Sequence, residues 1–118
     1  MIDVDRIRQA AARIENVALV TPLLHSRFLS DVTGADVWLK AENLQRTGSF
    51  KIRGAMNKVA SLGAAASSGV VAGSAGNHAQ AIAFAAQVNG IACEIFVPAG
   101  ASISKIAACR AYGATISE

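Results

Sequence analysis

The sequence predicts an α/β fold, a three-layer sandwich built on a parallel sheet, and two observations carry this prediction. From residue 70 onward, short apolar runs alternate with helical segments. Such alternation is typical of parallel strands joined by right-handed crossover helices that pack against the sheet. The chain is also 53% hydrophobic and 16% charged, against typical values of about 45–50% and about 25%. That composition indicates a domain that buries much of its surface, in part against something outside these residues.

Five elements are expected before residue 63. They are a helix over residues 3–14, an extended segment over 20–24, a short helix over 26–32, a strand over 37–40 and a helix over 49–62. The apolar positions of the first helix recur at helical spacing and are Val4, Ile7, Ala11 and Ile14. Pro22 pushes the residue before it toward extended backbone. Ser49 is a good N-cap, because its hydroxyl can accept from a free N–H of the first turn.

The second half of the chain has a more regular pattern. Residues 63–69 are small, and they form either a hinge or a helix end followed by a loop. The expected elements after them are a strand over 70–72, a loop over 73–77, a helix over 78–88, a strand over 92–97, a helix over 104–112 and a strand over 114–117. Pro98 stops the second of these strands, and Gly113 is the C′ glycine of the last helix. Because the chain ends on a strand, we expect the sheet to be incomplete at the C-terminus.

Composition excludes several classes of protein. The formal charge is +3 without a basic cluster, and nucleic-acid binding needs positive charge concentrated on one face. Residues 59–93 contain no charged side chain, but polar residues interrupt every stretch of the about 20 residues that a membrane span needs. The acidic N-terminus has no apolar core of a signal peptide. Cys93 and Cys109 lack CxxC spacing, so we expect reduced, buried thiols in a cytoplasmic protein, with no metal.

The first candidate site lies where the loop of residues 45–48 enters the helix that begins near Ser49. This places Lys51 in the first helical turn, where the partial positive charge of the helix N-terminus disfavours an ammonium. Gly54 and Ala55 follow one turn later without bulk, so a flat molecule could lie against the backbone there. With Phe50 beside it, Lys51 suits Schiff-base chemistry with an aldehyde cofactor. The alternative is a solvated surface lysine.

The second candidate site is the loop Ser74-Ala75-Gly76-Asn77-His78 between a strand and a helix. Ligands of parallel sheets bind beyond the carboxyl ends of the strands, and the loop N–H groups would hold an anion such as a carboxylate. Asn77 offers a donor and an acceptor. In the alternative interpretation, Gly76 only makes a tight turn, Asn77 only caps the helix and His78 is structural. The loop lacks G-x-G-x-x-G spacing, which disfavours a dinucleotide site.

With both loops in hand, the chain closely resembles the fold-type II pyridoxal phosphate enzymes, and within them the threonine dehydratases (threonine ammonia-lyases). The matching segments cover nearly the whole chain in family order; they are residues 21–23, 40–55, 74–80 and 104–114. The pair formed by Ser49-Phe50-Lys51 and the loop of residues 74–78 is highly specific, whereas neither motif suffices alone.

This resemblance implies a set of roles. Lys51 would form the Schiff base with pyridoxal 5′-phosphate and later move the α-proton, Phe50 would flank the cofactor ring, and Asn77 would hydrogen-bond its phenolic oxygen. The substrate carboxylate would be held by Ser74, Gly76, Asn77 and His78. The implied reaction is α,β-elimination of water from L-threonine or L-serine, with release of ammonia and a 2-oxo acid. The implied setting is cytoplasmic amino-acid metabolism, including isoleucine biosynthesis, with self-association of the full-length form.

Two features qualify the resemblance. Serine racemases of this group carry a serine where this chain has Ala75, and cysteine synthases usually carry threonine in place of His78, so a dehydratase is favoured over these sister activities. The family's glycine-rich phosphate loop has no match here. The resemblance assigns residues 1–62 to the N-terminal part of the large domain and residues 63–118 to the beginning of the small one. We therefore expect the isolated chain to be inactive. The alternatives are a serine racemase-like or other fold-type II enzyme and an inactive truncated α/β fragment.

Overall fold

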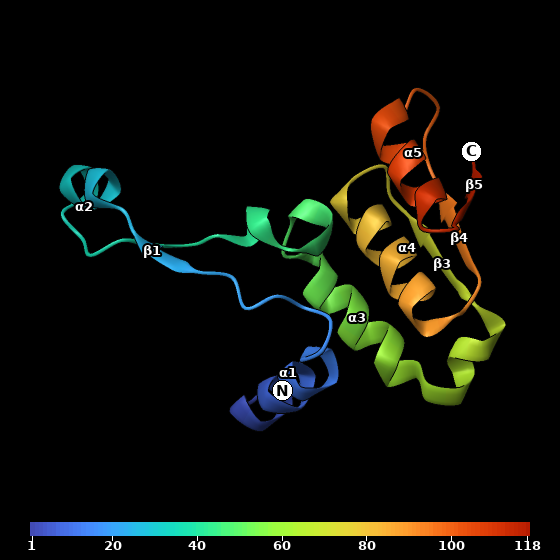
Figure 1. Cartoon of the computed structure of the whole chain (residues 1–118), viewed down its shortest axis with the longest axis horizontal. Helices are drawn as coiled ribbons and strands as arrows, with labels where there is room; N and C mark the ends of the chain where they lie inside the picture. The colour runs from blue at the N-terminus through green and yellow to red at the C-terminus, as the bar shows by residue number, and fades with distance from the viewer.

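The computed structural model describes all residues, 1–118, and Figure 1 shows their path. The α-helices are α1 (Val4–Ile14), α2 (Arg27–Thr33), α3 (Lys51–Leu62), α4 (Asn77–Asn89) and α5 (Ile103–Ala111). The strands are β1 (Leu23–His25), β2 (Trp38–Lys40), β3 (Val70–Gly73), β4 (Cys93–Phe96) and β5 (Thr115–Ser117). Short 3-10 turns occupy Glu42–Leu44, Arg46–Gly48 and Gly63–Ser68. Each predicted helix and strand is therefore present, with ends shifted by at most three residues.

The parallel sheet consists of β3, β4 and β5 in that order. Val70 pairs with Cys93 in the first ladder, and Glu94 pairs with Thr115 in the second. The α4 and α5 crossovers run in the same direction along this sheet, so both helices lie against the same face (Figure 1). The side chains of β4 alternate accordingly: Ile95 is 0% exposed toward the helices, whereas Phe96 is 43% exposed on the other face. The predicted α/β class with a parallel sheet is confirmed, and these residues supply helices to one face of it.

The core is built around α4, which lies between the sheet and α3. Alanines of α4 are buried on both sides of the helix; they are Ala79, Ala81, Ala83, Ala85 and Ala86. The facing side of α3 contributes Ile52, Met56 and Val59, each no more than 3% exposed. Small side chains on α4 let the two helices approach closely. This packing joins residues on either side of position 62, and the division into two domains there stays a prediction.

The first strands are arranged differently from the rest. β1 and β2 form a separate antiparallel ribbon with Leu23 opposite Lys40 and His25 opposite Trp38. The ribbon and α2 project away from the helical body (Figure 1). The sequence pattern did not predict this pairing, because the short strands carry no register signal of their own. The expected apolar stripe of α1 is also mostly open, since Val4 and Ile7 are about 60% exposed and only Ile14 is buried. None of the helices is long and apolar enough to cross a bilayer.

Candidate active site

Lys51 is the first residue of α3, as the sequence predicted. The Ser49 hydroxyl accepts from the Lys51 N–H at 3.4 Å, and Ser49 is extended while Phe50 already has helical dihedrals. Phe50, not Ser49, holds the N-cap position of α3, so the predicted Ser49 cap was placed one residue too early, although the Ser49 hydroxyl still accepts from the first helical N–H. This turn fixes the direction in which the Lys51 side chain leaves the backbone.

The Lys51 side chain lies at an open hollow of about 320 Å³. Its Nζ is 4.9 Å from the centroid of the Phe50 ring, and the lining residues are Phe50, Lys51, Arg53, Gly54, Ala55 and His78. A Cβ placed on Gly54 would meet nothing within 4 Å, so the room expected beside the lysine is present. Ala55 is 3% exposed and belongs mainly to the core. Lys51 is exposed rather than enclosed.

The Ser74–His78 loop joins β3 to α4. Gly76 is the N-cap of α4 without a side-chain cap bond, so Asn77 begins the helix and does not cap it. The Ser74 hydroxyl accepts from the Gly76 N–H at 3.3 Å, and the Ser74 N–H donates to the Phe96 carbonyl at 3.0 Å. No backbone carbonyl accepts from the N–H groups at the start of α4, residues 77–79. The loop thus offers the free donors that the sequence analysis expected.

Packing of α3 on α4 brings part of the two motifs together. His78, in the first turn of α4, lines the same hollow as Lys51 and Phe50. Ser74, Gly76 and Asn77 lie outside the lining of that hollow, further along the loop. The structure therefore brings His78 of the loop to the hollow that contains Lys51. The other loop residues precede His78 in the chain and do not line this hollow.

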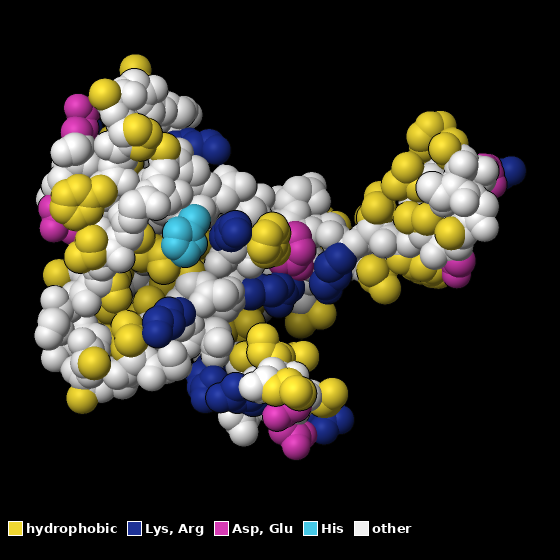
Figure 2. Space-filling model, turned by 180° about the vertical axis from the view of Figure 1, so that it is seen from behind, with side chains coloured by type: hydrophobic (Ala, Val, Ile, Leu, Met, Phe, Trp, Pro, Cys, Tyr) yellow, Lys and Arg dark blue, Asp and Glu magenta, His cyan; other side chains and the backbone are white.

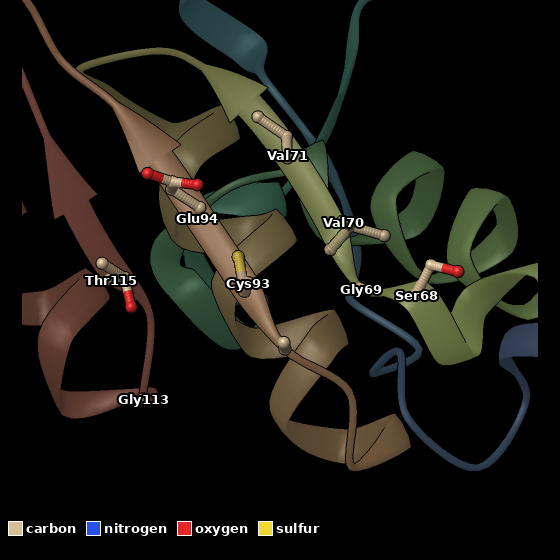
Figure 3. A pocket seen from close by; sticks show the side chains of 9 residues that line it. Ser68, Gly69, Val70, Val71, Cys93, Glu94, Gly113 and Thr115 are labelled. Carbon is tan, nitrogen blue, oxygen red and sulfur yellow. The ribbon is translucent and has the colours of Figure 1, made fainter.

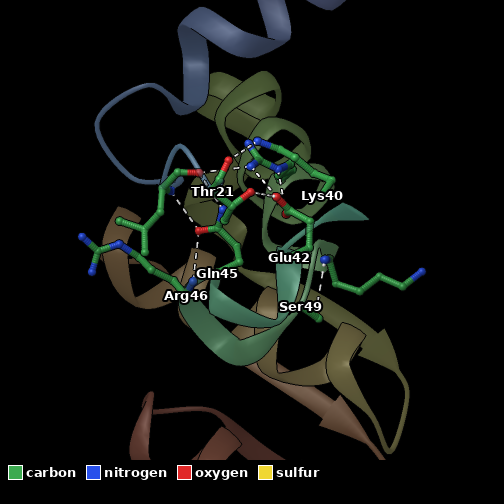
Figure 4. Close-up of polar contacts among 9 residues, drawn as sticks. Thr21, Lys40, Glu42, Gln45, Arg46 and Ser49 are labelled. Carbon is green, nitrogen blue, oxygen red and sulfur yellow. Dashed lines mark hydrogen bonds and ion pairs between the residues drawn. The ribbon is translucent and has the colours of Figure 1, made fainter. Parts of the chain in front are cut away.

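A polar network beside this site was missed by sequence reasoning. Arg53 donates from Nε to Glu42 Oε2 at 2.9 Å and from Nη2 to Glu42 Oε1 at 2.7 Å, a two-point ion pair. The Thr21 hydroxyl also donates to Glu42, and the Lys40 ammonium donates to the Thr21 carbonyl. Figure 4 shows Thr21, Lys40 and Glu42 converging in this network. The hydrogen bonds from Arg53, with Thr21 assisting, lower the pKa of Glu42 from 4.5 to about 2.

The same region fastens the segment that leads from α1 to β1. The Gln45 side chain accepts from the Leu19 N–H at 2.9 Å and donates to the Leu19 carbonyl at 2.8 Å. Arg46 donates to the Val17 carbonyl at 2.8 Å, and Arg53 donates to the Leu19 carbonyl at 3.0 Å. Gln45 and Arg46 are both labelled in Figure 4. Residues 17–21 are thereby tied to the segment that presents Lys51. The only feature of the sequence that could have indicated this polar network is the presence of charged side chains in a chain that is otherwise apolar.

Thr47 is the one non-glycine residue with positive φ, at 63°. Its hydroxyl is buried and has no hydrogen-bond partner. Left-handed backbone is unfavourable for a β-branched residue, and an unpaired buried hydroxyl adds to the cost. The loop before Lys51 is therefore strained at Thr47. The sequence, in which Gly48 is the residue suited to a positive φ, did not predict this strain.

Another hollow, of about 340 Å³, lies at the other end of the sheet. It is lined by residues that include Gly69, Val70, Cys93, Glu94 and Thr115 (Figure 3). These residues lie at or near the amino ends of the strands, opposite the edge at which ligands of parallel sheets bind. Glu94 accepts from the Ser117 hydroxyl at 2.6 Å. Its Cys93 thiol is buried and its Glu94 carboxylate is hydrogen-bonded, and the hollow does not belong to the candidate site.

Both cysteines are free and buried, as predicted. Burial raises the pKa of Cys109, and burial together with the neighbouring Cys109 raises the pKa of Cys93. A raised pKa keeps each thiol protonated near neutral pH, so neither is a nucleophile. No group of three or more His, Cys, Asp or Glu side chains is placed to hold a metal ion.

Comparison with known proteins identifies the family. Residues 14–118 match the family described as pyridoxal-phosphate dependent enzyme, and the chain belongs to this family. The match confirms the resemblance, the fold class and pyridoxal phosphate as the cofactor of the family.

Individual relatives carry several activities. The chain is 50% identical to an L-threonine ammonia-lyase of Thermotoga maritima over 98% of this chain and 29% of that protein. It is 50% identical to an L-threo-3-hydroxyaspartate ammonia-lyase of Pseudomonas sp over 92% of this chain and 34% of that protein. The solved serine racemase of Dictyostelium discoideum superposes with a TM-score of 0.92 at 40% identity, over 98% of this chain and 38% of that one. The chain thus spans about a third of the length of these relatives.

Proposed function

We propose that this chain carries the lysine-bearing part of a pyridoxal-phosphate-dependent ammonia-lyase acting on L-threonine or L-serine. The observation that carries the proposal is the Lys51 amine at the start of α3, beside open space at Gly54 and across from His78 of α4. The site residues fit the cofactor, because a primary amine, an aromatic ring 4.9 Å from it and room for a flat molecule occur together. When bound, the cofactor supplies an aldehyde for the amine and a ring that accepts electrons.

Each residue has a defined task in this proposal. Lys51 Nζ anchors the cofactor and then accepts the proton from the substrate Cα. Phe50 would flank the cofactor ring, and the Asn77 side chain would hydrogen-bond its phenolic oxygen. Ser74, Gly76, Asn77 and His78 hold the substrate carboxylate, with the unpaired N–H groups at the start of α4 as donors.

The proposed reaction balances without an oxidant or reductant. The substrate loses its Cα proton to Lys51, and the β-hydroxyl takes up a proton and leaves as water. The unsaturated amine that remains adds water and releases ammonia, which leaves the 2-oxo acid. We place this activity in the cytoplasm, because free buried thiols suit a reducing compartment. We also propose that the full-length form self-associates.

Borohydride reduction of the protein in the presence of pyridoxal 5′-phosphate tests the role of Lys51. We expect a stable mass adduct on the peptide that contains Lys51, and its absence in a Lys51→Ala variant. Lys58→Ala is the matched control, because Lys58 is an exposed lysine of the same helix. An adduct confined to another lysine, or none at all, refutes the proposal.

The second candidate function is a racemase, as in the Dictyostelium relative. A racemase needs a second acid–base group on the opposite face of the ring, and Ala75 has no such group. Product analysis with L-serine separates the two: a lyase forms pyruvate and ammonia, whereas a racemase forms D-serine. We expect the 118-residue chain alone to form neither product, because it supplies one wall of the site.

A further inference from the structure

Lys105 lies next to the loop that is proposed to hold the substrate carboxylate. It is the third residue of α5, on an element that sequence analysis left without a function. Its Nζ is 3.9 Å from the position that a Cβ on Gly76 would occupy. The absence of a side chain at Gly76 leaves the space between the loop backbone and this ammonium open.

The Lys105 ammonium has no counter-ion within the protein. The four ion pairs of the structure involve Arg8, His25, Arg27 and Arg53, and none involves Lys105. Residues 43–93 contain no Asp or Glu, so α4 and the loop before it present no carboxylate to this amine. Glu94, the nearest acid along the chain, accepts a hydrogen bond from Ser117.

Free donors therefore lie beside the open space at Gly76. The N–H groups of residues 77–79 donate to no backbone carbonyl, and the ammonium of the half-buried residue Lys105 adds a full positive charge. Two helix N-termini, of α4 and α5, add partial positive charge at the same edge of the sheet. Such an arrangement is unfavourable without an anion and favourable with one.

We propose that Lys105 binds a carboxylate group of the amino-acid substrate at Gly76 and is the cationic member of the substrate site. This inference rests on the proposed function, since that function places a carboxylate at the loop. The carboxylate is either the α-carboxylate common to all amino acids or the second carboxylate of a substrate such as 3-hydroxyaspartate. The second possibility makes Lys105 a residue that determines substrate specificity.

The test compares Lys105→Met with the unaltered full-length holoprotein. Calorimetry measures the dissociation constants of two anions. Acetate carries one carboxylate and malonate carries two. We expect Lys105→Met to weaken binding by about 10- to 100-fold, the size of one hydrogen bond to a charged group. Lys58→Met removes a positive charge from an exposed lysine elsewhere in the chain and serves as the control.

The outcomes separate the two sources of the carboxylate. Weaker binding of both anions assigns Lys105 to the α-carboxylate, and weaker binding of malonate alone assigns it to the second carboxylate. Unchanged affinity for both anions overturns the proposal. In parallel, kcat/KM for L-threonine and for L-threo-3-hydroxyaspartate should fall through KM, with kcat within about twofold. The borohydride adduct at Lys51 should persist in Lys105→Met, so failure of this inference is distinguishable from failure of the proposed function.

Discussion

Glu42 is the residue at which several separate segments are held together. Its carboxylate receives both nitrogens of Arg53 and the hydroxyl of Thr21, and its side chain is 16% exposed. Arg53 lies two residues after Lys51 and lines the same hollow. The ion pair therefore sets where α3 starts relative to the chain before it, and with it the place from which the lysine extends.

The low pKa of Glu42 makes this contribution depend on pH. The pKa falls from 4.5 to about 2 on folding, so the stabilisation is complete above about pH 5 and is lost as the pH falls toward 2. We expect Glu42→Gln to lower the free energy of unfolding at pH 7 by about 2 kcal/mol, a value reduced from the full linkage because Arg53 is one-third exposed. The variant should also lose this part of the acid dependence. Urea unfolding at pH 7 and pH 3 measures both effects.

A matched control for Glu42→Gln is Asp5→Asn. Asp5 pairs with Arg8 at 3.1 Å, but both side chains are more than three-quarters exposed, and such surface pairs contribute little. An Asp5→Asn effect as large as that of Glu42→Gln would contradict the assignment of the stabilisation to the Glu42–Arg53 pair.

Among the elements, the passage from the 3-10 turn Gly63–Ser68 into β3 depends on Gly69. Its φ is +85°, and a Cβ there would lie 2.9 Å from the Ala92 carbonyl oxygen and 3.1 Å from the Ala92 Cβ. The backbone of Ala92 cannot move away freely, because its carbonyl accepts from the Val70 N–H at 2.9 Å at the start of the β3–β4 ladder. Conformation and close approach therefore both require glycine at this position.

We expect Gly69→Ala to destabilise the fold by about 2–4 kcal/mol, since it combines the strain of a backbone conformation essentially restricted to glycine (φ +85°, ψ −179°) with a backbone clash. Gly63→Ala is the control, because Gly63 also has a positive φ (+54°) outside the αL region but nothing within 4 Å of its Cβ position, and it should cost only about 1–2 kcal/mol. Thermal or urea unfolding of the two variants isolates the steric part. Equal losses would show that contact with Ala92 contributes nothing.

At the scale of the whole molecule, apolar surface is left open in two places. The segment of β1, α2 and β2 projects from the body and carries side chains that are 47–74% exposed; they are Leu23, Leu24, Phe28, Val32, Trp38 and Leu39. Figure 2 shows hydrophobic side chains over this projection. The sheet face opposite α4 and α5 is open as well, with Val71 66% exposed. The radius of gyration is 16.4 Å, against about 13.5 Å for a compact domain of this length.

The 118-residue chain studied by itself is therefore expected to self-associate, because contiguous apolar surface of this kind favours burial between copies. Sedimentation velocity over a range of concentrations should show an average mass that rises with concentration. Replacing Phe28 and Val32 by lysine should weaken the association, whereas Ala60→Lys together with Ala64→Lys adds the same charge away from the projection. A monomer at every concentration would refute this expectation.

Local residue patterns predicted the local structure well. Helical spacing and the glycines after α2 and α5 placed the elements, because those signals act over a few residues. The same signals placed Lys51 at a helix start and the loop of residues 74–78 at the carboxyl end of a strand. The assignment of Asn77 as a possible cap was wrong, because Gly76 holds the cap position.

The sequence by itself determined the α/β class, the succession of elements, the lysine and the loop, because each depends on residues close together in the chain. Only the tertiary structure decided the antiparallel pairing of β1 with β2, the contact of Arg53 with Glu42, the meeting of Lys51 with His78 and the position of Lys105 beside Gly76. These contacts join residues 11 to 29 positions apart, and their geometry follows from how α3 and α5 pack on the rest of the chain. Local patterns carry no information on such distances, because packing of the whole chain fixes them.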